Sequence, residues 1–336
     1  MHKKINEFVW ILVLALAVVI ISAWSLSCGP AAIPLKRLLA LISAGASGSE
    51  QSIIFDIRLP RILLGLAVGG ALSLAGVILQ GMFRNPLVEP YTLGISGGAA
   101  LGVCLNIVFK LHYVLGFFSL PLFGFLGAAL VISLVYALAL KKGSLRIQNL
   151  LLIGVMISFI SSSLIMLIMA LARGRDLYTI IFWIMGSLQQ SSWLLIKGLL
   201  LVSVLGLVLA YLFCHHLNAL SLGEEQALHL GINIERTKRT LFILASLLTG
   251  FSVAAAGIIG FVGLVVPHFV RMFSGENHRL LLVGSFFCGA GFLVFSDTIA
   301  RTIIAPAELP VGVVTGILGG SLFIYALTKR KAFGAE

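Results

Sequence analysis

Apolar residues run in long, nearly unbroken stretches along the whole chain, and short polar intervals separate them. Stretches such as 62–83 and 150–172 are rich in Leu, Ala and Gly and lack the polar–apolar alternation of a β-barrel strand. A helix needs roughly 20 apolar residues to cross about 30 Å of hydrocarbon, and it satisfies its backbone hydrogen bonds internally. The pattern therefore predicts transmembrane helices.

Ten spans are predicted, which places both ends of the chain on one side of the membrane. Their approximate ranges are 8–27, 60–83, 92–110, 118–140, 148–172, 192–214, 240–259, 261–274, 280–299 and 312–328. The span 261–274 is short and contains Pro267, so a partial helix, and a total of eight or nine spans, is an alternative. No interval is long enough for a sizeable soluble domain. We expect one all-α integral membrane domain, a polytopic helical bundle over residues 1–336.

Composition supports a membrane protein. Hydrophobic residues make up 60% of the chain, charged residues 10%, and the mean hydropathy is +1.11, whereas a soluble domain carries about 25% charged residues. The net charge of +11 comes from basic residues in short loops rather than from one basic face, so a nucleic-acid partner is not expected. With both termini in the cytoplasm, fourteen of the 23 Lys and Arg residues lie inside and nine outside, as the positive-inside bias requires.

The two halves of the sequence resemble each other. At an offset of 181, Gly69, Ala75, Gly76, Ile78, Pro86 and Gly94 meet Gly250, Ala256, Gly257, Ile259, Pro267 and Gly275. The predicted topology runs the two copies in opposite directions, which is typical of an inverted repeat with broken segments beside a transport path. We interpret "RNPLVEP" (84–90) as the cytoplasmic turn between two spans, paired with "VVPHFVR" (265–271) in the second copy.

The sequence lacks the residues expected for three other functions: acidic residues within the spans for ion coupling, a phosphate-binding loop for ATP, and clustered ligands for a metal. Acidic residues lie in loops or at helix ends, and only Asp297 is near a span, where Arg301 can pair with it at helical spacing. A proton- or sodium-driven carrier would need such groups within the membrane. No G-x-x-x-x-G-K-[ST] loop occurs, the His residues are scattered, and the four Cys residues are far apart. The chain is therefore not expected to be an enzyme or to bind a cofactor or metal.

Two polar features suggest partners. The interval His215–Arg239 is long for this chain and reads as short amphipathic helices at about 218–234, whose apolar stripe suits a groove on another protein; an ordinary surface loop is the alternative. On the outer side we expect Arg58, Arg61 and Arg301 to face water at helix ends. Singly they resemble snorkelling arginines, and as a set they form a positive surface for an acidic partner.

The sequence resembles the FecCD-type, vitamin B12 permease-like family of ATP-binding-cassette (ABC) importer permeases for iron–siderophores, haem and cobalamin. The matching stretches cover most of the chain in the expected order: "RLPRILLGLAVGGALSLAGVILQGMFRNPLVEPYTLGISGGAALG" (58–102), "FWIMGSL" (182–188), "LSLGEEQALHLGI" (220–232), "GFVGLVVPHFVR" (260–271) and "DTIARTIIAPAELPVGVVTGILGG" (297–320). The first stretch is long and specific.

The resemblance implies a type II importer permease with ten helices per subunit. It also implies its partners: a second permease copy, forming a homodimer, or a homologous permease; two cytoplasmic ATPase subunits that bind ATP and Mg; and an extracytoplasmic substrate-binding protein. By resemblance, Arg58, Arg61 and Arg301 meet acidic residues of the binding protein.

The resemblance also implies roles for individual positions. The coupling helices that enter the ATPase would contain Leu220, Ser221, Leu222, Gly223, Glu224, Glu225, Ala227, Leu230 and Gly231. By position alone, Ile147, Gln148 and Asn149 fall near the cytoplasmic gate, although "GSLRIQN" departs from the family pattern. The translocation path is further expected beside Gln80, Asn85, Pro86, Gly97 and Gly98.

The cargo is less defined than the machinery. "EPYTLGISGGAALG" (89–102) resembles iron-complex members most, which favours an iron(III)-siderophore chelate. Haem and vitamin B12 are the alternatives with the same machinery. An ion-coupled secondary transporter is a more distant alternative, disfavoured by the lack of acids within the spans.

Overall fold

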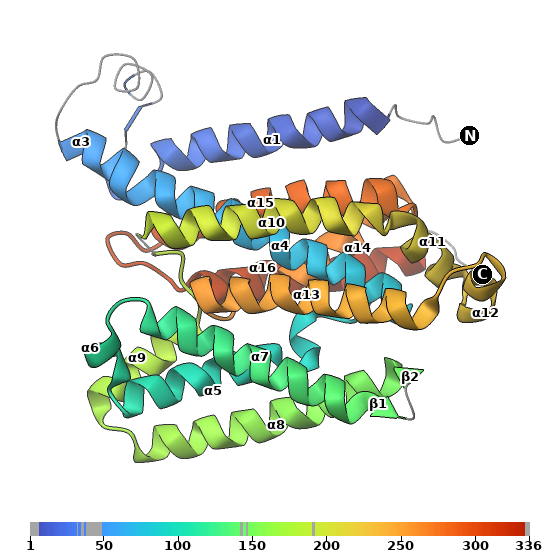
Figure 1. The fold of residues 1–336 in the computed structure, drawn as a ribbon. Coiled ribbons are helices and arrows are strands. Elements are labelled where there is room, and N and C mark those ends of the chain that lie inside the picture. Colours follow the sequence, from blue (N-terminus) through green and yellow to red (C-terminus); the bar gives the residue numbers. More distant parts are fainter. Residues whose placement is uncertain are drawn as a thin grey trace.

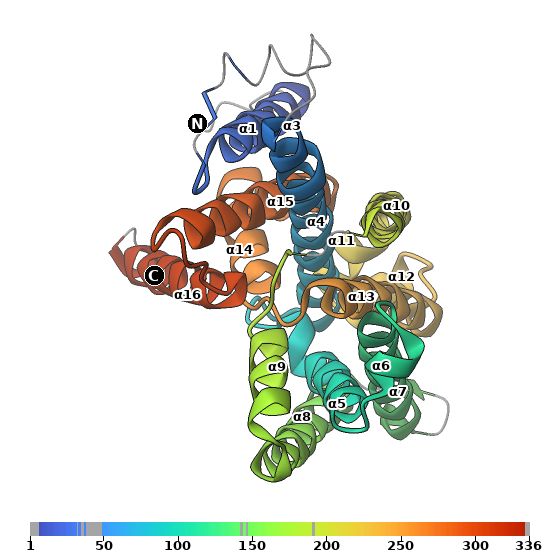
Figure 2. The same cartoon turned by 90° about the vertical axis from the view of Figure 1, so that its left-hand side faces the viewer.

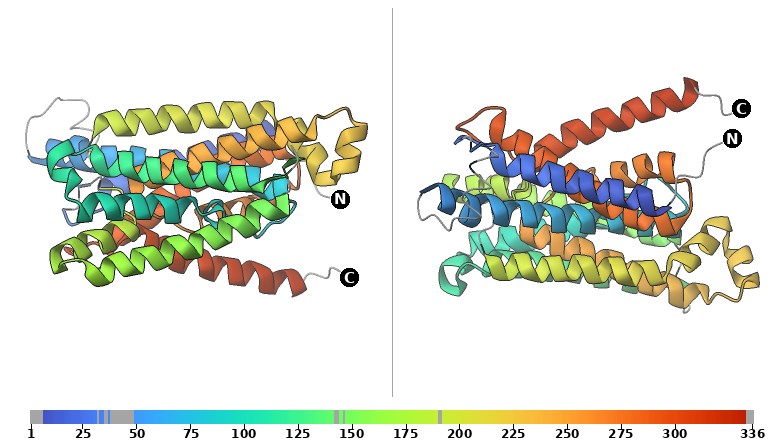
Figure 3. Two further views of the ribbon diagram at one scale, coloured as in Figure 1. Left: turned by 60° about the horizontal axis from the view of Figure 1, so that its bottom comes forward. Right: turned by 90° about the horizontal axis from the view of Figure 1, so that it is seen from above.

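The computed structural model describes residues 7–31, 33–34, 37, 49–141, 144–145, 147–189 and 192–332. These form a bundle of long helices that run roughly parallel or antiparallel to one another (Figure 1). We call its two ends the α9 end and the α11–α12 end after helices that lie there. The start of α1 and the end of α16 both lie at the α11–α12 end (Figure 3).

Helices account for nearly all of the described structure. In chain order they are α1 (Glu7–Ser27), α3 (Ser49–Ser52), the π-helix η1 (Ile53–Arg58), α4 (Leu59–Phe83), the 3₁₀ helix η2 (Pro90–Leu93), α5 (Ile95–Val108), α6 (Leu111–Leu115), α7 (Ser119–Ala139), α8 (Ile147–Leu171), α9 (Gly174–Ile184), α10 (Trp193–Leu212), α11 (Cys214–Leu222), α12 (Glu224–His229), α13 (Ile234–Ala256), α14 (Val262–Ser274), α15 (His278–Thr302) and α16 (Val311–Ala332). The two-residue strands β1 (Leu140–Lys141) and β2 (Ser144–Leu145) pair antiparallel between α7 and α8.

Each of the ten predicted spans corresponds to a helix. Seven helices are long and apolar enough to cross a membrane, and α5, α14 and the apolar part of α16 are shorter. The partial helix considered for 261–274 is α14, which has only 13 residues. The short helices α9 and α6 were not predicted.

The central helix is α4, which contacts α10, α13, α14 and α15 (Figure 2). Small residues allow its neighbours to approach closely. A Cβ on Gly69 would lie 2.3 Å from the carbonyl oxygen of Gly289 in α15, and one on Gly76 would lie 1.9 Å from that of Gly263 in α14. Small residues are the usual device for packing membrane helices, because lipid offers no hydrophobic driving force between them.

The inverted repeat is visible in the order and direction of the helices. The series α4, α5, α7, α8 has 25, 14, 21 and 25 residues, and the series α13, α14, α15, α16 has 23, 13, 25 and 22. Helix α4 runs toward the α11–α12 end and α13 runs away from it (Figure 1).

The residue pairing at a constant offset of 181 is wrong beyond the first helix of each repeat. Pro86 lies in the link between α4 and η2, whereas Pro267 lies inside α14. The reason is that the link 84–94 before α5 is longer than the link 257–261 before α14, so the second repeat reaches its short helix sooner.

Candidate functional site

Four charged side chains form a cluster at the α9 end. Nε of Arg61, in α4, donates to Oδ1 of Asp297, in α15, at 2.8 Å, and its Nη1 donates to Oε2 of Glu308 at 2.7 Å. Nε of Arg301 lies 3.1 Å from Oδ2 of Asp297. We call Arg61, Asp297, Arg301 and Glu308 the ion cluster; its two positive and two negative charges balance within one chain.

The expected exposure of the three arginines is wrong. Arg58, Arg61 and Arg301 are only 3%, 5% and 4% exposed. Helix ends predicted from hydropathy do not show which segments pack against them. Here the end of α1 and the residue Ala31 after it contact Arg58 and Arg301, and Asp297 and Glu308 pair with Arg61. Arg58 donates to the carbonyl oxygens of Leu26 and Ala31, and Arg301 donates to the hydroxyl of Ser25 at 2.8 Å.

Glu308 is the member of the ion cluster that reaches solvent, with 29% of its side chain exposed. It lies outside the spanning helices and also accepts a hydrogen bond from Nε2 of Gln189 at 2.7 Å. Burial alone would raise the pKa of this carboxyl, but the hydrogen bond and positive charge of Arg61 outweigh burial and lower it. The side chain is therefore ionised at neutral pH.

A cavity of about 500 Å³ lies beside the ion cluster. Arg61, Glu308 and Gln189 line it together with aromatic side chains of α9, among them Tyr178 and Phe182. Helix α9 was missed from sequence because its apolar residues are too few for a span, although "FWIMGSL" was noted as a motif.

A second polar site lies halfway along the bundle. Oε1 of Glu89 accepts a hydrogen bond from the backbone N–H of Phe261 at 2.7 Å, and the hydroxyl of Tyr91 donates to the carbonyl of Ile259 at 3.0 Å and accepts from its N–H at 3.1 Å. These bonds join the links that precede α5 and α14. Gly263, which follows, packs against Leu72 in the middle of α4.

The position of Glu89 corrects the interpretation of "RNPLVEP" as a simple surface turn. Arg84 and Asn85 do end α4 at the α11–α12 end, with Arg84 in the left-handed conformation at φ 50°. The chain then folds back inward, so that Glu89 caps the start of α14 inside the bundle. Sequence alone could not show this, because the acceptor role depends on Phe261, which is 172 residues away.

Gly97 and Gly98 are packing positions on α5. A Cβ on Gly97 would lie 2.9 Å from Cβ of Ser161 in α8, and one on Gly98 would lie 2.6 Å from the carbonyl oxygen of Gly127 in α7. Both residues therefore set how closely α5 packs on its neighbours. Their expected place beside a translocation path stays a prediction.

The interval predicted to hold amphipathic helices forms α11 and α12, which project beyond the bundle (Figure 3). Gly223, at φ 135°, separates the two helices, and Gly231, at φ 77°, follows α12. Glu224 accepts from Nζ of Lys238 in α13 at 2.8 Å, and this ion pair ties α12 to the next span. The prediction of short helices is confirmed.

The apolar residues of α11 and α12, with Leu230 directly after α12, divide into a buried set and an exposed set. Leu217, Leu220 and Ala227 are buried, whereas three leucines are mostly exposed. The exposed ones are Leu222, Leu228 and Leu230, at 66%, 60% and 65%. Ser221 and Glu225 are exposed beside them. We call Leu222, Leu228 and Leu230 the leucine patch.

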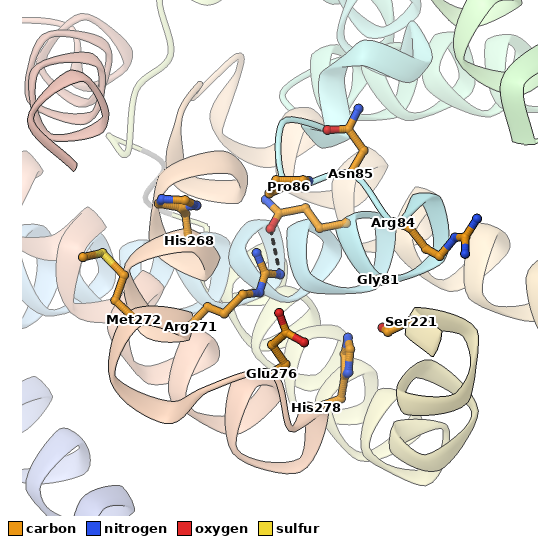
Figure 4. A pocket seen from close by; sticks show the side chains of 11 residues that line it. Gly81, Arg84, Asn85, Pro86, Ser221, His268, Arg271, Met272, Glu276 and His278 are labelled. Atoms are coloured by element: carbon orange, nitrogen blue, oxygen red, sulfur yellow. Dashed lines mark hydrogen bonds between the residues drawn. The ribbon is translucent and has the colours of Figure 1, made fainter. Parts of the chain in front are cut away.

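A polar cavity of about 320 Å³ lies between α4, α11 and α14 (Figure 4). Gln80, Asn85, Pro86 and Ser221, which were predicted to act in the path or in coupling, all line it. Gln80 is buried, accepts from Nη2 of Arg271 at 3.1 Å, and donates to the carbonyls of Gly263 and Leu264. The cavity thus brings together residues that the sequence assigned to two different roles.

The positions expected near a gate lie at the start of α8, which begins at Ile147. Gln148 is exposed and Asn149 is half-buried, and their role in gating stays a prediction. Among the described residues, no group of three His, Cys, Asp or Glu side chains could hold a metal ion.

Comparison with known proteins identifies relatives over the whole length of the chain. The model of the FecCD transport family matches residues 14–329. The hemin transport system permease protein HmuU of Yersinia pestis is 36% identical over 335 residues, which cover 98% of each chain. The cobalamin import system permease protein BtuC of Halobacterium salinarum is 39% identical over 292 residues, 87% of this chain and 78% of that protein.

A solved structure shares the architecture. It is described as an inward-facing conformation of a putative metal-chelate type ABC transporter, and it superposes with a TM-score of 0.84 at 32% identity. The match covers 96% of this chain and all of the other. The predicted type II importer permease fold is confirmed by this likeness.

Proposed function

Because the chain belongs to the FecCD transport family, a family of non-enzymatic ABC permeases, we propose that it is the membrane subunit through which a metal chelate of the iron(III)-siderophore type is imported. A separate ATPase would drive the transport and a substrate-binding protein would deliver the cargo. The observation that carries the proposal is the leucine patch, a set of exposed apolar side chains at the α11–α12 end. The sequence contains no G-x-x-x-x-G-K-[ST] loop, so the proposal assigns ATP binding to a partner.

We place the α11–α12 end, and with it both termini, in the cytoplasm. The leucine patch would then face the compartment that contains ATP, and the ATPase would receive α11 and α12 in a cleft. Leu222, Leu228 and Leu230 are the residues we assign to direct contact. Leu220 and Ala227 are buried and would hold the helices in place, with Gly223 and Gly231 providing the bends.

We place docking of the binding protein at the opposite, α9 end. The burial of Arg58, Arg61 and Arg301 changes their part in this proposal from exposed charges to the support beneath the docking surface. They hold the end of α1, α4 and α15 together. Exposed Arg173 and Arg175, beside α9, are the positive charges that an acidic partner could reach.

A second copy of the chain would complete the transport path. Helices α8, α9 and α16 border one side of the bundle (Figure 2), and exposed apolar residues such as Ile317 and Phe182 lie there. The cavity beside the ion cluster is lined by residues of α9 and by Val311, the first residue of α16. A path between two copies would pass the aromatic residues that line this cavity. Aromatic side chains suit a bulky chelate with an apolar surface.

The mechanism is conformational rather than chemical. ATP binding would close the ATPase pair and move α11 and α12, and the permease would respond because its inward- and outward-open states differ in the affinity for that closed pair. The chain would supply no nucleophile or proton. Its contribution is to couple one movement to another.

The cargo is proposed by analogy and chemistry. The relatives named for hemin and cobalamin handle metal macrocycles, and the structural relative is described as metal-chelate type. A ferric siderophore belongs to the same class of bulky chelates, and "EPYTLGISGGAALG" favours it. Haem and vitamin B12 are alternative cargoes for the same machinery.

Uptake into proteoliposomes tests the proposal. Vesicles containing this chain, its ATPase and its binding protein should accumulate radiolabelled ferric hydroxamate when ATP is present on the α11–α12 side. An ATPase whose catalytic Glu is replaced by Gln should abolish uptake. Uptake that continues with that ATPase, and that stops when the proton or sodium gradient is dissipated, would indicate an ion-coupled carrier.

A further inference from the structure

The first turn of α15 is capped by a side chain from another helix. Oδ1 of Asn218, in α11, accepts a hydrogen bond from the backbone N–H of His278 at 2.9 Å and lies 2.8 Å from Nδ1 of the same residue. Backbone N–H groups in the first turn have no partner within the helix. Helix α15 therefore depends on α11 for one of its caps.

The contact has a defined protonation pattern. The amide Nδ2 of Asn218 points to Oδ1 of Asn277 at 3.4 Å, which leaves Oδ1 facing His278. Because an amide oxygen can only accept, Nδ1 of His278 carries the proton. The ring is 3% exposed and its Nε2 faces Gly81 of α4, where a Cβ would lie 2.7 Å away. The imidazole is thus held between α11 and α4.

A second contact lies on the same face of α11. Nε2 of His215 is 2.7 Å from Nη2 of Arg279, the residue after His278. Residues 215 and 218 are three apart, so they share one face of the helix. Two neighbouring side chains of α11 therefore contact two consecutive residues of α15.

The other end of α15 belongs to the ion cluster. The helix has 25 residues, which corresponds to about 37 Å at 1.5 Å per residue. Asp297, in one of its last turns, contacts Arg61, and Arg301, in its last turn, contacts Ser25 near the end of α1. One continuous helix therefore connects α11 with the charged residues at the far end of the bundle.

We propose that Asn218 is a positioning residue for transport, which fastens α11 to α15 so that movement of α11 and α12 is carried along α15 to the α9 end. The inference rests on the proposed function, because an ATPase must drive that movement. Without the Asn218 contact, α11 moves alone. ATP is then hydrolysed while the α9 end keeps its conformation.

Labelling of a cysteine at the α9 end tests this directly, without knowledge of the cargo. Thr302→Cys is placed at the exposed end of α15 after the four native cysteines are replaced. Its reaction rate with a membrane-impermeant maleimide is measured in the permease–ATPase complex, with and without ADP and vanadate. ATP hydrolysis and thermal stability are measured on the same samples.

We expect Asn218→Leu to hydrolyse ATP at close to the rate of the parent complex while losing the nucleotide-dependent change in labelling rate. Asn218→Asp keeps an oxygen that accepts both N–H groups and should retain the change. Asn277→Ala is the matched control. It removes the cap that Oδ1 of Asn277 provides to the backbone N–H of Arg279 at 3.1 Å and the longer contact with Nδ2 of Asn218 at 3.4 Å, but it leaves the hydrogen bond from the N–H of His278 to Asn218 in place. It should also retain the change. If Asn218→Leu does not assemble, Asn218→Ser, whose hydroxyl is too short to reach His278, replaces it.

Two results would overturn the inference while leaving the proposed function intact. One is a full labelling response in Asn218→Leu. The other is loss of the response in Asn277→Ala as well, which would make the stability of the α15 cap, rather than its link to α11, the cause. A parent complex whose ATPase neither binds nor responds to the permease would instead overturn the proposed function, and this inference with it.

Discussion

The two ends of the bundle differ in which side chains they bury: charged side chains are buried at one end, and apolar side chains are exposed at the other. At the α9 end, Arg61, Asp297 and Arg301 are buried and pair with one another inside one chain. At the α11–α12 end, the leucine patch is 60–66% exposed on and directly after helices that project beyond the bundle. The ion cluster is complete within one chain, whereas the leucine patch lacks a partner.

This difference separates two kinds of mutational effect. Removing a buried charge leaves its partner without compensation and destabilises the fold itself. Removing an exposed leucine leaves the fold intact, because surface substitutions usually change stability by less than about 0.5 kcal/mol, and it weakens association instead. Stability and partner binding, measured on the same variants, therefore test whether the two ends differ in this way.

Asp297→Ala should have the largest effect. It leaves Arg61 and Arg301 buried beside each other, and breaking a buried pair in this way costs about 3–5 kcal/mol. The measurement is the unfolding temperature of the purified protein in detergent. Asp56→Ala, which removes an exposed carboxylate in η1 at the same end, is the control and should change little. Equal unfolding temperatures for the two variants would show that the ion cluster does not stabilise the fold.

Leu230→Asp should come second and should spare the fold. A charge in the centre of an apolar contact would weaken binding of the ATPase by at least about 2 kcal/mol, the range of interface hot spots. Titration of the detergent-solubilised permease with the ATPase measures this change. Val114→Asp, at an even more exposed apolar position in α6 at the α9 end, should bind the ATPase normally. If both variants bind as the parent does, the leucine patch is not the ATPase contact.

The helices were predictable because each span is a local property of about 20 residues. The starts and ends of α4, α7, α8 and α10 fall within one or two residues of the predicted ranges. The leucine patch was also foreseeable, because after Ser221 apolar residues alternate with acidic and polar ones over a short interval. In both cases the signal lies within one segment of the sequence.

The ion cluster and the cap by Glu89 could not be predicted in the same way. Arg61 and Asp297 are 236 residues apart, and hydropathy places both at the ends of spans, where solvent is the default expectation. Their burial follows from how α1, α4 and α15 pack. The repeat at a constant offset also failed for this reason, since the length of the link before each short helix is set by the contacts the link makes.

Glu89→Ala tests the middle of the bundle, between the two ends. It removes the acceptor for the N–H of Phe261 and leaves that part-buried group without its partner, which costs about 1–2 kcal/mol. Glu89→Gln keeps an oxygen at the same place and should recover most of the loss in unfolding temperature. If Glu89→Gln lowers the unfolding temperature as much as Glu89→Ala does, the negative charge of Glu89 rather than its hydrogen bond stabilises the fold. Glu89 would then act through its charge, as the residues of the ion cluster do.

Glu308→Gln should have the smallest effect on stability. The pH dependence of that effect should show whether the ion pair with Arg61 causes it. The side chain is partly exposed and Arg61 keeps Asp297 as a partner, so the loss at pH 7 should be about 1 kcal/mol or less. Because Arg61 lowers the pKa of Glu308 in the folded protein, the parent gains this stability above the unfolded pKa of about 4.3 and loses it as the pH falls through the lower folded value. The difference in unfolding temperature between parent and variant should therefore stay constant from pH 7 to pH 5 and shrink below about pH 4. A difference that grows on acidification would mean that the folded pKa is raised, and that burial, rather than Arg61, controls the one carboxylate of the ion cluster that solvent can reach.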